Sequence, residues 1–80
     1  MSVTRVAALQ MVSAPELAPN LAAAERLMAA AAAAGARLAA LPENFYCIGR
    51  TERDKVALRE PDGKGPIQDF LSAVSKKNNL

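Results

Sequence analysis

Glu43 is the residue of this 80-residue chain whose type and place are best suited to chemistry. It follows residues 37–41 (RLAAL), which predict a short strand, and Pro42, which ends strand hydrogen bonding. In open α/β sheets, functional groups gather just beyond the carboxyl ends of the strands. A carboxylate placed there and partly shielded from water by Phe45 and Tyr46 would suit a general base, because desolvation favours its proton-holding form. A surface glutamate in a loop explains the position equally well, so both interpretations stay open.

Two neighbours of Glu43 could also take part in chemistry. Cys47 would need a nearby base or cation to form a thiolate, and the local sequence offers Glu43 and Arg50. A small buried residue is the better interpretation, because free cysteines are among the most often buried side chains. Asn44 could donate a hydrogen bond to a substrate, but we expect it to cap the loop instead.

The composition excludes several classes of site and partner. Without histidine the chain cannot build a Ser/His/Asp or Cys/His pair or a Cys/His zinc site, and one cysteine allows no internal disulfide. Residues 12–19 lack the glycines of a dinucleotide-binding loop. A net charge of +2, spread along the chain, indicates neither nucleic-acid nor membrane binding. With no apparent signal peptide or membrane span, we expect a cytoplasmic protein.

The first half of the chain predicts a β-α-β unit. Residues 3–11 (VTRVAALQM) are nearly all apolar, as in a strand buried on both faces of a parallel sheet. After a proline-containing loop, Asn20 is expected to be the N-cap of a helix over 20–34. Gly35 should end this helix in the left-handed conformation. The residues expected on its buried face are Leu21, Ala24, Met28 and Ala31.

The second half predicts two more helices. Residues 52–59 favour one or two helical turns, and residues 60–65 (EPDGKG) a turn. Pro66 is well placed to open a last helix, with Gln68 on its wet side. Its expected buried face consists of Ile67, Phe70, Leu71 and Val74. A third strand would be due after Leu80, so we expect residues 1–80 to be the amino-terminal part of a larger domain.

These segments resemble the start of the nitrilase superfamily of carbon–nitrogen hydrolases. The resemblance rests on RVAALQM, on Asn20-Leu21 opening a helix, and on GARLAALPENF at 35–45. Residues 60–80 are similar to the family's next turn and helix. The resemblance implies an α/β fold in which residues 1–80 form an amino-terminal fragment of a single hydrolase domain. This fragment would be the β-α-β-α portion of an αββα sandwich, and the full-length protein would form homo-oligomers.

The resemblance also implies the chemistry. The family uses a Glu-Lys-Cys triad in which the cysteine attacks an amide or nitrile carbon, the glutamate is the general base and the lysine stabilises the oxyanion. No cofactor or metal is required. Only Glu43, the glutamate of LPENF, carries over; Lys55 and Cys47 do not match the family's lysine and cysteine. Those two would follow in later motifs, so we expect the isolated chain to be inactive.

The stretch 45–65 (FYCIGRTERDKVALREPDGKG) is similar to the small-amidase branch of the family, which includes ω-amidases and amidases of deaminated glutathione. The substrate would then be a small linear carboxamide such as a 2-oxo amide. A nitrile hydrolase or a carbamoyl-amine hydrolase remains open. The alternative from another class is a non-catalytic αβ interaction fragment that binds a partner through its open sheet edge. Only the enzyme requires a lysine and a cysteine in later motifs.

Overall fold

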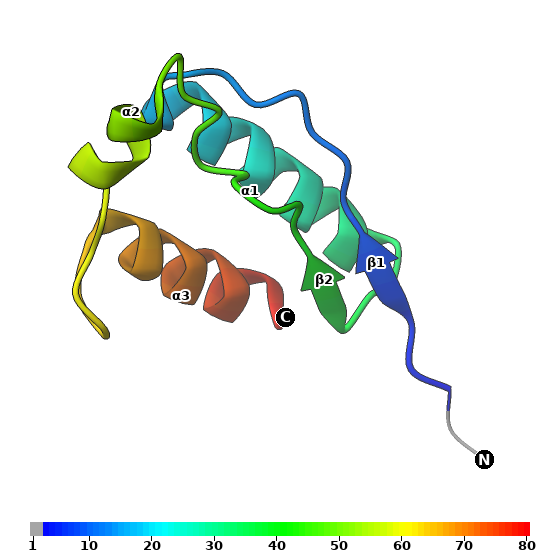
Figure 1. Cartoon of the computed structure of the whole chain (residues 1–80). Coiled ribbons are helices and arrows are strands. Elements are labelled where there is room, and N and C mark those ends of the chain that lie inside the picture. Colours follow the sequence, from blue (N-terminus) through cyan, green and yellow to red (C-terminus); the bar gives the residue numbers. More distant parts are fainter. Residues whose placement is uncertain (1–2) are drawn as a thin grey trace.

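The computed structural model describes residues 3–80, apart from the side chains at positions 52 and 55. The order of elements is β1 (Val6–Ala8), α1 (Leu17–Ala33), β2 (Leu38–Ala40), α2 (Glu52–Ala57) and α3 (Pro66–Asn78) (Figure 1). The expected α/β class and the β-α-β-α order are therefore confirmed, with α2 as the short additional helix that the sequence predicts.

The two strands pair in parallel. The register of the pair is Val6↔Leu38, Ala7↔Ala39 and Ala8↔Ala40. One backbone hydrogen bond extends the pairing at each end, from Leu9 N–H to Ala40 O at 2.9 Å and from Arg37 N–H to Arg5 O at 2.8 Å. Because the chain must cross over between parallel strands, α1 is their connection. The parallel pair is confirmed, although both strands are shorter than predicted.

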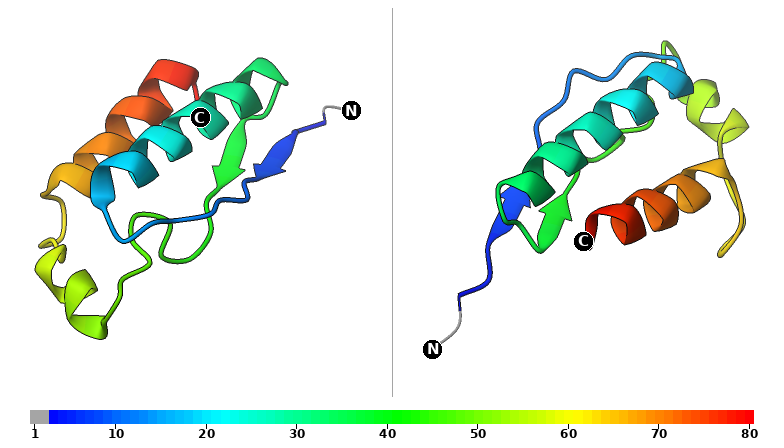
Figure 2. Two further views of the ribbon diagram at one scale, coloured as in Figure 1. Left: turned by 90° about the horizontal axis from the view of Figure 1, so that it is seen from above. Right: turned by 180° about the vertical axis from the view of Figure 1, so that it is seen from behind.

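The two faces of this sheet differ in exposure. Val6 and Leu38 share one face and are 62% and 61% exposed, whereas Ala7 and Ala39 share the other and are half-buried. Helices α1 and α3 lie on the same side of the strands (Figure 2). Small alanine side chains let a helix approach a sheet closely. The expectation that residues 3–11 form a strand buried on both faces is wrong within residues 3–80, because no described element covers the second face of the sheet.

Helix α1 begins earlier than the sequence predicts. It starts at Leu17 after Glu16, which makes no side-chain capping bond. Pro19 is tolerated in this first turn, because the amides there lack intrahelical partners. Asn20 is therefore not the N-cap: it lies inside the helix and is 2% exposed. The other buried residues of α1 are Ala24, Met28 and Ala31, as expected, whereas Leu21 is half-buried.

The end of α1 agrees with the prediction. Gly35 has φ +92°, a conformation that costs glycine little. Its N–H donates to Ala32 O, and the N–H of Ala36 donates to Ala31 O, both at 3.0 Å. This pair of bonds is the Schellman arrangement, which satisfies the last carbonyl groups of a helix.

Helix α3 packs beside α1. Pro66 occupies its first turn, as predicted. Val74 is buried, and the rest of the expected face is half-buried: Ile67, Phe70 and Leu71. Gln68 was expected on the wet side but is half-buried, because its amide donates to Pro61 O at 2.7 Å and Lys64 O at 2.8 Å.

The carboxylate of Glu60, which precedes the intervening turn, caps α3. Its N-cap residue, Gly65, has no side chain that could accept the first amide hydrogens. Glu60 accepts instead, from Ile67 N–H at 2.6 Å and from Gln68 N–H at 3.0 Å. The negative charge also lies favourably at the amino end of the helix dipole. The sequence predicted a turn over 60–65 but not this capping role.

The cap makes stability depend on pH. Burial works to raise the pKa of Glu60, but hydrogen bonds from Ile67 and Gln68 outweigh it and hold the pKa below its ordinary value. A carboxylate whose pKa is lowered by folding stabilises the protein above its unfolded-state pKa and loses that contribution as pH falls through its folded-state pKa. We therefore expect the free energy of unfolding of Glu60→Gln to fall less on acidification than that of the wild type.

Denaturant unfolding of the full-length protein and of Glu60→Gln, between neutral pH and about pH 3, measures this effect. The wild-type free energy of unfolding should fall more steeply with acidification than that of the variant. Equal slopes would contradict the role of the Glu60 carboxylate.

Candidate active site

Glu43 lies directly beyond the carboxyl end of β2, after Pro42, where the sequence places it. Its side chain is exposed. Phe45 is buried, and its ring packs edge to face on Tyr46, with centroids 5.7 Å apart and planes at 82°. The expectation that these rings shield Glu43 from water is therefore not met within residues 3–80. Any desolvation of this carboxylate must come from groups outside them.

Two consecutive turns shape the backbone around Glu43. Phe45 N–H donates to Pro42 O at 3.2 Å, and Cys47 N–H donates to Asn44 O at 3.1 Å. Asn44 has φ +58°, at the third position of the first turn, where asparagine is one of the few residues that tolerate a positive φ. Asn44 thus has a backbone role in this turn, while the expectation that it caps the loop stays a prediction.

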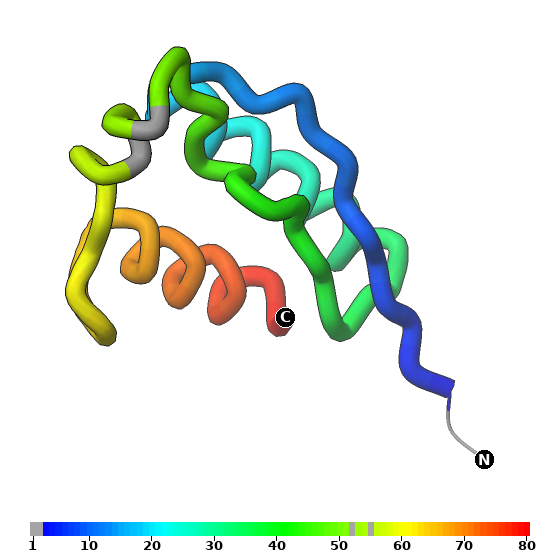
Figure 3. The backbone as a smooth tube through the Cα atoms, viewed as in Figure 1, coloured from blue at the N-terminus to red at the C-terminus, as the bar shows by residue number. Residues whose placement is uncertain are grey.

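The segment after β1 and the first turn of α1 both hold the loop that carries Glu43. Ser13 Oγ donates to Phe45 O at 2.9 Å, and the buried Asn20 donates through Nδ2 to Tyr46 O at 2.8 Å. Figure 3 shows the segment after β1, in blue, and the loop after β2, in green, running from the strands toward the start of α1. Polar contacts from two separate parts of the chain thus meet just after Glu43.

Cys47 belongs to this same loop. It is fully buried, and its Sγ donates to Pro15 O at 3.3 Å. Its interpretation as a small buried residue is therefore confirmed. The side chain of Lys55, the other residue set aside in the sequence analysis, lies outside the part of the chain that the structure describes.

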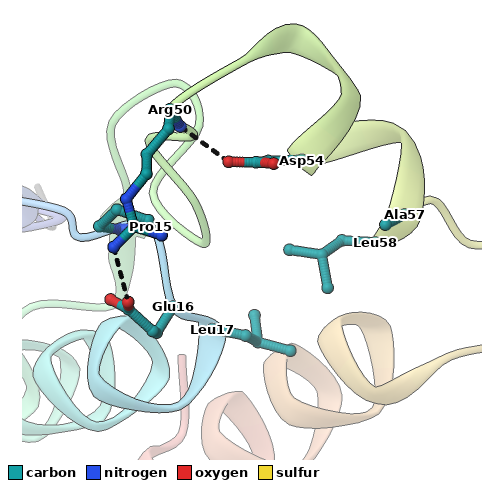
Figure 4. Close-up of a pocket in the computed structure, with 7 residues that line it drawn as sticks. All are labelled: Pro15, Glu16, Leu17, Arg50, Asp54, Ala57 and Leu58. Atoms are coloured by element: carbon teal, nitrogen blue, oxygen red, sulfur yellow. Dashed lines mark hydrogen bonds and ion pairs between the residues drawn. The ribbon is translucent and has the colours of Figure 1, made fainter.

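A cavity of about 290 Å³ lies between the start of α1 and α2. Its lining residues are Pro15, Glu16, Leu17, Arg50, Asp54, Ala57 and Leu58 (Figure 4). The Arg50 guanidinium lies 3.4 Å from the Glu16 carboxylate, and Asp54 accepts from Arg50 N–H at 2.8 Å. Both partners of the ion pair are exposed, so it adds at most about 1 kcal/mol to stability. This cavity could not be predicted from the sequence, because its lining residues come from two separate segments of the chain.

The family model for carbon-nitrogen hydrolases matches residues 5–80, which include both strands, all the helices described above and Glu43. The chain belongs to the carbon-nitrogen hydrolase family. The family level of the sequence resemblance is thereby confirmed, as is hydrolysis of C–N bonds at that level. No solved structure matches the chain significantly.

In this carbon-nitrogen hydrolase the structure separates the candidate residues. Glu43 is exposed beyond β2, Cys47 is buried in the same loop, and Arg50 lines the cavity near α2. The roles of Ser13 and of the buried Asn20 were not predicted, because the only sequence signal for them was the hydrogen-bonding type of their side chains. Within residues 3–80, side chains 52 and 55 aside, no metal-binding group of three or more His, Cys, Asp or Glu residues is found. No helix in that part is long and apolar enough to cross a membrane.

Proposed function

We propose that this chain is part of an amidase of small linear carboxamides and that Glu43 is its general base. One observation carries the proposal: the family match spans 5–80, and within it Glu43, in LPENF, lies just beyond the carboxyl end of β2, after Leu41 and Pro42. The carboxyl end of a strand is where α/β enzymes place reactive groups. The exposure of Glu43 supports the role, because a substrate and other catalytic groups can reach this carboxylate.

The proposed reaction uses a lysine and a cysteine from motifs outside residues 1–80. The cysteine thiol gives its proton to Glu43 as the sulfur attacks the carbonyl carbon, and the lysine stabilises the oxyanion. Glu43 then returns the proton to the leaving nitrogen, and ammonia departs from the thioester. Water, losing a proton to Glu43, cleaves the thioester to a carboxylic acid and frees the thiol. Residues 1–80 alone are expected to be inactive.

The proposed substrate class is narrower than the range of C–N bonds that the family as a whole hydrolyses. The similarity of residues 45–65 to the small-amidase branch favours a linear carboxamide such as a 2-oxo amide. The full-length protein is proposed to act as a cytoplasmic homo-oligomer without a cofactor.

Ammonia release by the full-length protein tests the substrate class. We would compare a 2-oxo amide with a nitrile and an N-carbamoyl amine of matched chain length. The 2-oxo amide should have a kcat/KM at least about 100-fold higher, since a site built for one polar group rejects analogues that leave its partners unpaired. Preference for the nitrile or the carbamoyl amine would contradict the small-amidase assignment.

A further inference from the structure

Asn20 makes an unusually complete set of contacts for a buried side chain. Its Oδ1 accepts from Ala14 N–H at 2.7 Å, and its Nδ2 donates to Ala14 O at 2.7 Å and to Tyr46 O at 2.8 Å. The side chain is 2% exposed, so each of these groups would be costly to leave without a partner. Asn20 therefore fixes the segment after β1 and the loop after β2 relative to α1.

Two further bonds join the same segments. Ser13 Oγ donates to Phe45 O at 2.9 Å, and Ile48 N–H donates to Ala14 O at 3.1 Å. Through these bonds the position of residues 45–48 depends on residues 13–14, which lie far away in sequence.

These contacts bear on Glu43 because its own side chain is exposed and is not held by packing. Its backbone has β2 on one side and the turn closed by Phe45 N–H and Pro42 O on the other. Moving residues 45–46 would reorient this turn and the carboxylate that it carries. A displacement of about 1 Å in a catalytic group can cost about 100-fold in rate.

We propose that Asn20 and Ser13 are positioning residues for Glu43, acting through the carbonyl groups of Tyr46 and Phe45. This inference rests on the proposed role of Glu43 as general base. Neither residue touches the substrate; each fixes the loop so that the carboxylate meets the cysteine thiol in the right geometry.

Two variants of the full-length protein test the inference. Asn20→Asp keeps the shape and the acceptor for Ala14 N–H, but turns a donor into an oxygen that faces the carbonyls of Ala14 and Tyr46. Ser13→Ala removes a single bond from a half-buried site and keeps the test valid if Asn20→Asp does not fold. We expect kcat to fall about 10- to 100-fold for Asn20→Asp and about 3- to 10-fold for Ser13→Ala, with KM changed less than about twofold.

The control is Asn78→Asp, which removes a bond from Asn78 Nδ2 to Val74 O, 2.9 Å long, within α3. Its kcat should stay near wild type. A second readout is the double variant Ser13→Ala/Glu43→Asp. Because Glu43→Asp already displaces the carboxylate, Ser13→Ala should lower kcat less when Glu43→Asp is present than in the wild-type protein.

The positioning role would be overturned if kcat were unchanged in both positioning variants. It would also be overturned if Ser13→Ala lowered kcat equally with and without Glu43→Asp. Either result would leave the proposed role of Glu43 as general base intact. Full turnover by Glu43→Gln would instead overturn the proposed function and the inference with it.

Discussion

Glu43→Gln in the full-length protein should lower kcat/KM between about 100- and 10,000-fold, the usual contribution of a general base. The glutamine keeps the size of the side chain but cannot take the thiol proton. Because Glu43 is exposed, the fold should not depend on its charge. Ammonia release measures turnover, and thermal unfolding measures stability.

Glu25→Gln is the matched control, since it makes the same chemical change within α1, away from the loop that follows β2. It should retain wild-type turnover and stability. If Glu43→Gln also retained turnover, Glu43 could not be the base. If Glu43→Gln lost turnover only because it unfolded, its melting temperature would fall with its activity, which contradicts the expected intact fold.

Gly65→Ala should cause a large loss of stability, about 2–4 kcal/mol in the free energy of unfolding. Gly65 has φ +138°, which an L residue rarely adopts, and an added Cβ would clash with Cδ of Glu60. The carboxylate that caps α3 would have to move, so strain and loss of the cap would coincide. Denaturant unfolding of the full-length protein measures the change.

Gly63→Ala provides the comparison, because Gly63 also has a positive φ, +82°, but a Cβ there would meet nothing within 4 Å. Gly63→Ala should therefore lower the free energy of unfolding only by the cost of the positive φ for alanine, about 1–2 kcal/mol. Equal losses at the two positions would show that contact with Glu60 contributes nothing and would contradict the capping account.

Features with a local cause could be predicted from the sequence. Gly35 and Pro66 mark helix boundaries because their own backbone preferences decide the conformation there. The order of strands and helices followed from the spacing of apolar residues. The strands were predicted too long because they end where pairing ends, and pairing depends on the partner strand.

The predictions that failed concern residues whose roles depend on contacts outside their own turn or helix. Asn20 has the side chain of an N-cap, but whether it caps or is buried depends on where Ala14 and Tyr46 lie. Glu60 caps α3 across the intervening turn, which brings its carboxylate back beside Gly65. For the same reason the sequence could place Glu43 at the end of a strand but could not show how its loop is held.

The most direct test of Glu43 as general base is formation of the thioester in a single turnover of the full-length protein. Wild-type and Glu43→Gln proteins would be mixed with a 2-oxo amide, and the reactions would be quenched with acid at short times. The mass of the intact protein would then be measured by mass spectrometry. Wild-type protein should gain the mass of the acyl group as ammonia leaves, while Glu43→Gln should gain none on that timescale. Equal acylation of both proteins would contradict the role of Glu43.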